Sequence, residues 1–269
     1  MEYDGRGSYR FEHEYDAAPS HLFPPAVKWL IIVNVGIYLI EALLGATSGR
    51  YLQTIFRPLE LWPSDVFQRG CVWQLATYAF LHAGVMHILF NMLFLYWFGR
   101  EIEIVWGTRR FLAFYFSAAV FAGLIFACVH YVFGPLAFGC IGASGAIMAL
   151  VMVYGLWWPN RIILFMFIVP MRIRTFVLIT IGIEILSLLE VQNGIANMAH
   201  LGGLLYGFLV IRGGPALTRV REKYQRLHRQ DSAADQRRLD ELLDKVHRKG
   251  INSLSWRERR FLRKFSARR

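Results

Sequence analysis

Long apolar segments separated by short polar ones occupy most of the sequence between residues 28 and 211. An α-helix rises about 1.5 Å per residue and the hydrocarbon core of a bilayer is about 30 Å thick. Six segments are therefore candidate membrane spans: residues 28–44, 84–98, 111–133, 142–158, 173–189 and 196–211. The fourth and sixth are short for a full crossing, and we expect the fourth to end inside the membrane. The pattern predicts an all-α, polytopic membrane protein.

Two of the connections between these segments also carry apolar residues. Residues 45–78 form a long loop with scattered aromatic side chains. Such a loop is typical of an aromatic belt at the membrane interface or of an amphipathic element lying in the membrane surface. Residues 162–169 precede Pro170, Arg172 and Arg174, and we interpret them as interfacial rather than as part of the fifth span.

The two ends of the sequence differ from its apolar middle. Residues 1–25 are polar, contain three prolines and lack the apolar core of a secretory signal, so we expect a flexible lead-in. The basic segment from residue 213 onward predicts two short helices, one ending at Gly250 and one beginning with a capping box at residues 255–258. These helices either close on each other or lie on anionic lipid headgroups. The predicted division is a flexible segment (1–25), a membrane domain (26–212) and a basic helical tail (213–269).

Composition and charge agree with a membrane protein. Of the 269 residues, 55% are hydrophobic and 15% aromatic, a larger share than an ordinary soluble domain carries. The net charge of +11 is concentrated after residue 211, which indicates a cationic tail on a membrane body and argues against a nucleic-acid-binding protein. Three cysteines make no disulfide framework; Cys71 and Cys140 could pair on an oxidising side, but isolated apolar cysteines are commoner.

The distribution of arginine predicts the orientation in the membrane. With six spans both termini lie on one side, and positive residues accumulate on the cytoplasmic side. The loops after spans two and four carry Arg100, Arg109, Arg110, Arg161, Arg172 and Arg174. The opposite side has Arg50, Arg57 and Arg69, all in the first loop. We therefore predict that both termini are cytoplasmic, so spans two, four and six run from the outer to the inner face.

Each of these three spans carries an unusual polar side chain within its first two turns: His87 and Asn91, then Ser144, then His200. Taken singly, such a histidine makes a helix–helix hydrogen bond as readily as it serves a function, and a serine beside glycine is commonly a packing residue. Taken together they predict a site, because a serine hydroxyl is a weak nucleophile that needs an adjacent base, and histidine can take its proton. His87 and Asn91 share a helix face and can donate to an oxyanion, as can the backbone N–H of Ser144.

Three motifs on these spans resemble those of the rhomboid family of intramembrane serine proteases. They are Gly142-Ala143-Ser144-Gly145, His87-Ile88-Leu89-Phe90-Asn91 and Ala199-His200-Leu201-Gly202-Gly203, which match G-x-S-G, H-x-x-x-N and A-H-x-G-G. Trp73-Gln74-Leu75, Phe80-Leu81-His82 and the stretch from Gly99 to Gly107 also fit, and the resemblance covers about residues 28–211. G-x-S-G alone is a weak signal, but three motifs in the right order on the right spans are specific.

The resemblance implies a bundle of six transmembrane helices in which Ser144 is the nucleophile and His200 the general base, a dyad with no third acidic member. It implies that His87, Asn91 and the backbone N–H of Ser144 form the oxyanion hole. Expected substrates are single-pass transmembrane proteins, cut near the outer end of their membrane helix where helix-destabilising residues allow unwinding. We expect a multi-pass protein of the cell (inner) membrane, in contact with the lipid bilayer, that needs no metal ion or organic cofactor. Its oligomeric state is left open.

The sequence departs from the family pattern in two places. Leu61-Trp62-Pro63 stands where many members have a Trp-Arg pair, and Met148 replaces an aromatic that packs beneath the catalytic histidine. Neither change removes a chemical group. Glu184, in span five, is expected to make a structural hydrogen bond or to be a neutral acid in low dielectric; the alternative is that it orients the histidine as a third member. We interpret Glu103 as tying the second and third segments together, and His82 as supporting the loop.

Two other functions fit part of this pattern. A rhomboid-fold protein that binds client proteins without cutting them would share the fold, but the presence of both Ser144 and His200 argues against it. A membrane transporter would line its path with buried polar groups. Such folds often show internal repeats, and the two halves of this sequence show no convincing repeat.

Overall fold

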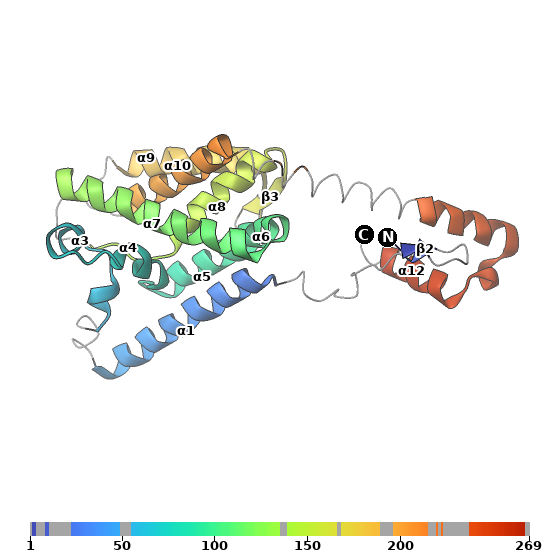
Figure 1. Cartoon of the computed structure of the whole chain (residues 1–269), viewed down its shortest axis with the longest axis horizontal. Helices are drawn as coiled ribbons and strands as arrows, with labels where there is room; N and C mark the ends of the chain where they lie inside the picture. Colours follow the sequence, from blue (N-terminus) through green and yellow to red (C-terminus); the bar gives the residue numbers. More distant parts are fainter. Residues whose placement is uncertain are drawn as a thin grey trace. The chain divides into compact units, whose positions relative to one another are not determined.

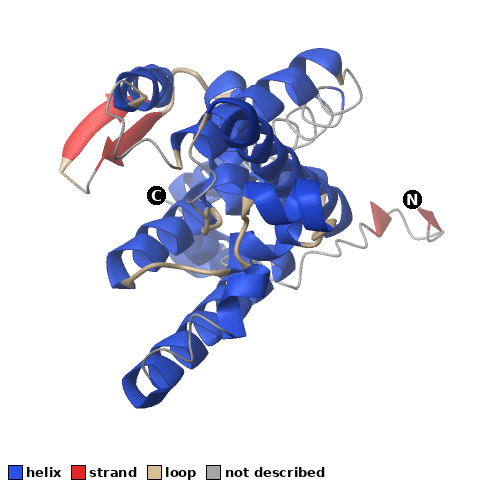
Figure 2. Cartoon of the chain, turned by 90° about the vertical axis from the view of Figure 1, so that its left-hand side faces the viewer, coloured by secondary structure: helices blue, strands red, loops and turns tan. Residues whose placement is uncertain are grey.

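The computed structural model describes residues 2–3, 9–10, 23–48, 55–134, 139–165, 168–188, 196–214, 219, 222 and 237–266. The chain divides into two compact units, Met1–Pro215 and Ala216–Arg269. Helices predominate in the described residues, as Figure 2 shows. Of the predicted lead-in, the structure describes mainly the short strands β1 (Glu2–Tyr3) and β2 (Tyr9–Arg10), which pair in antiparallel fashion.

Six helical segments of the first unit lie where the apolar segments predict them (Figure 1). They are α1 (Pro25–Ser48), α5 (Val85–Phe94) continued by η3 (Leu95–Gly99) and α6 (Arg100–Trp106), α7 (Thr108–Phe133), α8 (Ser144–Trp157), α9 (Ile173–Ser187) and α10 (Asn197–Gly213). The ends differ from the prediction by a few residues, except that the second segment extends beyond Phe98 to Trp106.

Helix length alone does not establish six crossings. In the described part of the chain, Pro25–Leu44 and Thr108–Phe133 are long and apolar enough to cross a membrane by themselves. A third candidate is the broken pair Gln74–Phe80 and Val85–Trp106, which is bent by 100°. Helix α8 is apolar but has 14 residues, so it is about 20 Å long. This length is less than the thickness of the hydrocarbon core, as the sequence predicts for the fourth segment.

Helix α8 forms the core of the first unit. Of its 14 residues, 11 are buried, and its apolar residues lie on all sides, as expected for a helix surrounded by others. Helices α7 and α10 pack along it, and α9, η3 and α5 also contact it. Helix α1 lies at the edge of the unit (Figure 1), and most of its apolar side chains are exposed. An exposed apolar helix of this length is the expected arrangement in lipid.

Short helices and one central carboxylate order the first loop. Its described part contains η1 (Arg57–Leu59), α3 (Pro63–Arg69), α4 (Gln74–Thr77) and η2 (Tyr78–Phe80). The buried carboxylate of Asp65 pairs with Arg57, with Arg69 at 3.2 Å, and with the amide of Gln74 at 3.5 Å. Burial raises the pKa of Asp65, but the hydrogen bond and charge of Arg57 outweigh it and hold the pKa below its ordinary value. The network therefore stabilises the loop above about pH 4 and loses that contribution as the pH falls.

A contact between tryptophan and arginine forms within this loop although the two residues are not adjacent in sequence. The guanidinium of Arg57 lies over the ring of Trp62, 4.2 Å from its centroid. The indole N–H of Trp62 donates to the carboxylate of Glu60 at 2.9 Å. The loop thus contains a contact between tryptophan and arginine, although its sequence lacks the adjacent Trp-Arg pair.

The first loop also supports the segment that leads into α8. Leu61 and Cys140 exchange two backbone hydrogen bonds of 3.1 and 2.9 Å, and the N–H of Gly142 donates to the carbonyl oxygen of Tyr78 at 2.9 Å. The hydroxyl of Tyr78 donates to the carbonyl oxygen of Ala119 on α7 at 2.9 Å. The thiols of Cys71 and Cys140 are free. The entrance to α8 is therefore held by the loop and by α7.

The segment that the sequence predicts to be interfacial forms a β-hairpin together with the residues that follow it. Strands β3 (Ile162–Phe165) and β4 (Val169–Arg172) pair in antiparallel fashion, with Ile162 opposite Arg172. Isoleucine and valine favour extended backbone, and Pro170 cannot continue a helix. The all-α prediction is right for the apolar segments and wrong for this connection, whose place at the membrane interface stays a prediction.

The second unit contains two short helices. Residues 237–249 are helical, and α12 (Trp256–Ser266) follows η4 (Ile251–Ser253). The N–H of Gly250 makes the last bond of this helix, to the carbonyl oxygen of Val246 at 2.8 Å, and its φ of 77° is one that residues with side chains rarely adopt. The predicted end of the first helix is confirmed.

The two helices of this unit contact each other through a shared carboxylate. The predicted capping box is present, since the N–H of Ser255 donates to the Glu258 carboxylate at 2.6 Å and the N–H of Glu258 donates to Ser255 Oγ at 3.3 Å. Lys245 of the first helix donates to the same carboxylate at 2.8 Å and is the main reason why the pKa of Glu258 falls to about 2. Leu242 and Leu254 are buried. Of the two predicted arrangements, the helices therefore adopt the one in which they close on each other.

Candidate active site

Ser144 and His200 are in hydrogen-bond contact. Ser144 is the first residue of α8, and His200 lies in the first turn of α10. The Oγ atom of Ser144 is 2.7 Å from Nε2 of His200. Neither side chain is fully buried. The two helices therefore run in the same direction with their N-terminal turns together, and the structure brings both predicted residues to one place.

Glycine allows the backbones of α8 and α10 to touch beside this pair. A Cβ atom added to Gly203 would lie 1.9 Å from the carbonyl oxygen of Gly145. One turn further, a Cβ atom added to Gly207 would meet the backbone of α8 at 2.5 Å. These separations leave no room for a side chain. Ser144 is the residue next to Gly145, and His200 lies about one helical turn before Gly203. The close packing of the two glycines therefore sets the distance between the side chains of Ser144 and His200.

We expect Gly203→Ala to destabilise the first unit. Forcing a methyl group against a backbone oxygen costs about 1–3 kcal/mol or more when the neighbour cannot move. A shift of α10 that relieves the clash would carry His200 away from Ser144. The measurement is thermal unfolding of the purified protein in detergent. Gly36→Ala on α1 is the matched control, because a Cβ atom there meets nothing within 4 Å; equal unfolding temperatures for the two variants would contradict the expectation.

The turn before Ser144 places His87 beside the serine. Gly142 has a φ of 122°, which residues with side chains rarely adopt. A Cβ atom at this glycine would lie 2.7 Å from Nε2 of His87 and 3.7 Å from Oγ of Ser144. His87 and Ser144 thus border the same small space, which stays open because residue 142 is glycine.

The hydrogen bonds of His87 and Asn91, both on α5, show which of their N–H groups could donate to an oxyanion. The backbone N–H of Ala83 donates to Nδ1 of His87 at 3.3 Å, so in the neutral imidazole Nε2 carries the proton. This Nε2–H is the atom that borders the space at Gly142. Asn91 is buried and donates one amide N–H to the carbonyl oxygen of His87 at 2.9 Å. A primary amide has a second N–H, which leaves Asn91 a further hydrogen bond to give.

Glu184 contacts the far side of the His200 ring. Its Oε1 atom is 2.8 Å from Nδ1 of His200, and the two side chains are 12% and 18% exposed. The side-chain amide of Asn197, on α10, also donates to the backbone carbonyl oxygen of Glu184 at 3.4 Å. Glu184, His200 and Ser144 therefore form a continuous chain of hydrogen bonds from α9 through α10 to α8. Of the alternatives that the sequence leaves open for Glu184, the structure shows a hydrogen bond to the histidine.

His82 and Glu103, two other polar residues singled out in the sequence, lie in different parts of the first unit. His82 is buried, with its ring edge-on to that of His87 at 5.1 Å between centroids. Glu103 of α6 accepts the N–H groups of Ala26 and Val27 at 2.9 Å each and the hydroxyl of Thr108 at 2.7 Å. It therefore ties α6 to α7, as predicted, and also to the start of α1.

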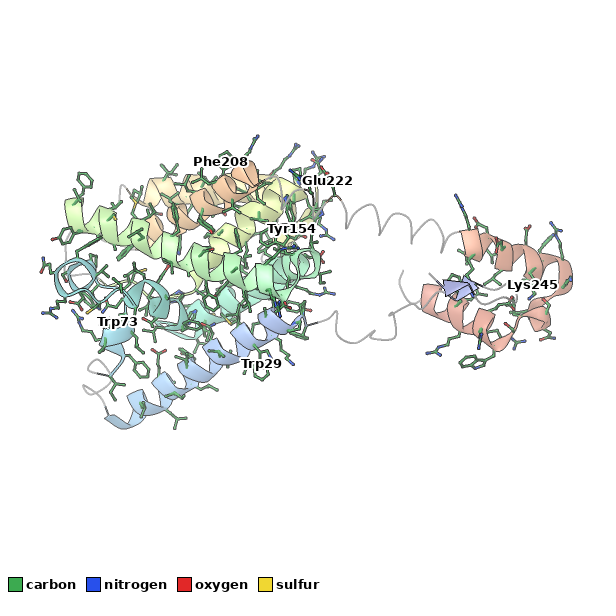
Figure 3. All side chains as sticks on the ribbon, viewed as in Figure 1. Trp29, Trp73, Tyr154, Phe208, Glu222 and Lys245 are labelled. Carbon is green, nitrogen blue, oxygen red and sulfur yellow. The ribbon has the colours of Figure 1, made fainter. Side chains whose placement is uncertain are left out.

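The candidate site lies at the end of the bundle that the first loop covers. Trp73, in this loop, and Tyr154, near the end of α8, lie at opposite ends of the first unit (Figure 3). Ser144 begins α8 directly after the segment that pairs with the loop. Met148 follows one turn later, with its Cβ atom near Gly203. Within the described ranges, no group of three or more His, Cys, Asp or Glu side chains is arranged to hold a metal ion.

Two family models match separate parts of the chain. A model described as the rhomboid domain matches residues 69–213, which is more than half of the chain and includes the candidate site. A second model, described as a family of unknown function, matches residues 225–268.

Curated relatives match much of the chain at moderate identity. RHOMBOID-like protein 12, mitochondrial, of Arabidopsis thaliana is 27% identical over 191 residues, which cover 66% of this chain and 54% of that protein. Rhomboid protease GlpG of Yersinia enterocolitica is 27% identical over 189 residues, covering 69% of this chain and 61% of that protein. Rhomboid protease GlpG of Haemophilus influenzae is 29% identical over 149 residues, covering 55% and 72%. This chain thus spans little more than half the length of the first two.

Proposed function

Because this chain belongs to the rhomboid family, we propose that it is a serine endopeptidase that cleaves single-pass transmembrane proteins near the outer end of their membrane helix. The observation that carries the proposal is the 2.7 Å contact between Ser144 Oγ and His200 Nε2. A nucleophile with its base already within hydrogen-bond distance is the arrangement that acyl transfer requires. The two relatives named rhomboid protease GlpG support the same activity.

In the proposed reaction Ser144 Oγ bonds to the scissile carbonyl carbon while its proton passes to Nε2 of His200 and the carbonyl π electrons move to the oxygen. Collapse of this tetrahedral intermediate breaks the C–N bond, and His200 gives its proton to the leaving amine. A water molecule then attacks the acyl ester by the same route, which releases the acid and restores Ser144. The hydrogen bond between Ser144 Oγ and His200 breaks only as the bond between Oγ and the scissile carbon forms. The base therefore needs no large movement.

Three donors are proposed to stabilise the negative oxygen: the Nε2–H of His87, the free amide N–H of Asn91 and the backbone N–H of Ser144. The first borders the space beside the serine. The third is at the start of α8, where backbone N–H groups have no partner within the helix and the helix dipole favours negative charge. Donors held in place before the reaction stabilise the oxyanion without having to reorganise.

We further propose that the six apolar helical segments of residues 26–212 all cross or enter the membrane, with both termini cytoplasmic. Residues 1–25 are then a segment that precedes the membrane domain and residues 213–269 a cytoplasmic tail of a protein of the inner membrane. The short helix α8 supports a site below the surface, since its N-terminal end with Ser144 need not reach the membrane boundary. A substrate must enter as an extended segment, because a helical backbone hides its scissile carbonyl.

The test is cleavage of a panel of single-span model substrates in detergent and in proteoliposomes, with the cut sites mapped by mass spectrometry. We expect cuts near the outer end of the substrate helix, and only in substrates with helix-destabilising residues there. Matched substrates with leucine at those positions are the control. Enzyme pretreated with a serine-directed fluorophosphonate is expected to lose activity. Folded protein that cuts none of the panel and takes up no fluorophosphonate would favour the rival in which the chain binds clients without cutting them.

A further inference from the structure

Glu184 joins the proposed dyad through a contact that the family pattern does not call for. Its carboxylate lies 2.8 Å from Nδ1 of His200, while the opposite ring nitrogen contacts Ser144. An ionised carboxylate has only lone pairs to offer, so Nδ1 is the donor in this bond when Glu184 is ionised. In the neutral ring the proton then resides on Nδ1, and Nε2 presents its lone pair to the serine hydroxyl. The bond to Glu184 therefore fixes the tautomer in which His200 can act as a base.

The position of Glu184 indicates that the bond orients the ring as well. It approaches from α9, whereas His200 belongs to α10 and Ser144 to α8, so the imidazole is held from two different helices. The amide of Asn197 holds the backbone of Glu184 from the first turn of α10. Both side chains are largely buried, which strengthens a charged hydrogen bond and raises the cost of leaving either partner without one.

From this arrangement we propose that Glu184 is a positioning residue for the catalytic histidine, so that Ser144, His200 and Glu184 work as a triad; this rests on the proposed protease function. Its carboxylate accepts the Nδ1–H bond and takes no proton during the reaction. The proton that leaves Ser144 resides on Nε2 and passes to the leaving amine, while the Nδ1 proton remains on Nδ1. The carboxylate stabilises the imidazolium that exists between these two transfers, in a site where water screens charge poorly.

A hydrogen bond that only holds α9 against α10 leads to a different expectation. Glutamine has the shape of glutamate, and its amide oxygen can accept the Nδ1–H bond, so a structural role survives Glu184→Gln. The proposed role does not, because the negative charge is lost and the amide can also turn its NH₂ group toward Nδ1 and stabilise the wrong tautomer. Among the described residues, Ser144 and Glu184 are in hydrogen-bond contact with the two ring nitrogens of His200.

The test compares Glu184→Gln and Glu184→Asp with the wild-type protein on one cleaved model substrate. We expect Glu184→Gln to lower kcat by about 10²- to 10⁴-fold with little change in KM, and Glu184→Asp to recover part of the loss because it keeps the charge. Thr180→Val is the matched control: Thr180 lies one turn earlier on α9 and donates to its own helix at Phe176. A Glu184→Gln protein with the wild-type kcat would overturn the proposal.

A second measurement decides the question even if the Gln variant does not fold. Nitrogen-15 NMR of histidine-labelled wild-type protein, at about pH 9 where an ordinary imidazole is neutral, reports which ring nitrogen of His200 carries the proton; the resonance is assigned by its loss in His200→Asn. The proposal requires Nδ1–H, and a proton on Nε2 would contradict it. Equal activity of Ser144→Ala and wild type would instead defeat the proposed function, while the NMR result would still judge the Glu184 contact on its own.

Discussion

Replacing Ser144 by alanine is expected to lower kcat by about 10⁴- to 10⁶-fold, and replacing His200 by alanine is expected to cost about as much. Without Ser144 no side-chain atom at the start of α8 can bond to the scissile carbon. Without His200 the hydroxyl keeps its proton and remains a weak nucleophile. The measurement is single-turnover cleavage of one model substrate by purified, folded variants, together with their labelling by a fluorophosphonate.

The double variant separates a cooperating pair from two independent contributions. Because Nε2 and Oγ are in direct contact, we expect Ser144→Ala with His200→Ala to be about as slow as either single variant. Matched controls are Ser117→Ala and His130→Ala on α7, whose side chains bond to carbonyl oxygens of their own helix at 2.6 and 3.0 Å. They are expected to keep a kcat close to that of wild type. Losses that add in the double variant would show that serine and histidine act separately.

The helical part of this fold can be predicted because it depends on a local property. A run of apolar residues long enough for a helix in lipid is visible in the sequence, and all six runs are helical in the structure. The hairpin at residues 162–172 cannot be recognised with the same ease, since a short apolar run fits either a strand or a buried helix segment. Pro170 indicates that the helix is interrupted, without indicating what replaces it.

The first loop shows what the sequence leaves undetermined. Asp65 pairs with Arg69 inside its own helix α3, at a spacing that the sequence shows, but its contacts with Arg57 and Gln74 come from two other short helices and depend on how these pack. The Arg57–Trp62 contact is equally invisible as a motif, because the two residues are separated by four others. Such networks follow from tertiary packing and have no periodicity that a sequence pattern could display.

Within the site, the predictable residues are those that carry motifs. Ser144, His200 and His87 are each flanked by characteristic neighbours, and the structure places them together. Glu184 has no such motif, and its place in the sequence gives its depth in a helix but not the direction in which the side chain points. The sequence singles it out for a physical reason: an acidic residue in an apolar helix is costly, and a histidine in a neighbouring helix is a partner that lowers the cost. The contact between them required the packing of α9 against α10.

The second large effect expected is at Asn91, where Asn91→Ala should lower kcat by about 10- to 10³-fold, the scale of losing one oxyanion donor. One amide N–H of Asn91 is engaged with the carbonyl oxygen of His87, so the argument concerns its second N–H. This donor gains its full value only when the oxygen becomes negative, and kcat should therefore fall with little change in KM. Steady-state kinetics on a mapped substrate separates the two parameters.

Asn34 provides a closely matched control for this prediction. It is buried on α1 and donates its amide to the carbonyl oxygen of Leu30 at 2.7 Å, the same bond to the preceding helical turn that Asn91 makes. Asn34→Ala and Asn91→Ala each lose one such bond, which is worth about 0.5–1.5 kcal/mol of stability. Only Asn91→Ala is expected to lose kcat. If Asn91→Ala instead unfolds at a much lower temperature and still turns over at the wild-type rate, Asn91 supports the packing of α5 and not the oxyanion.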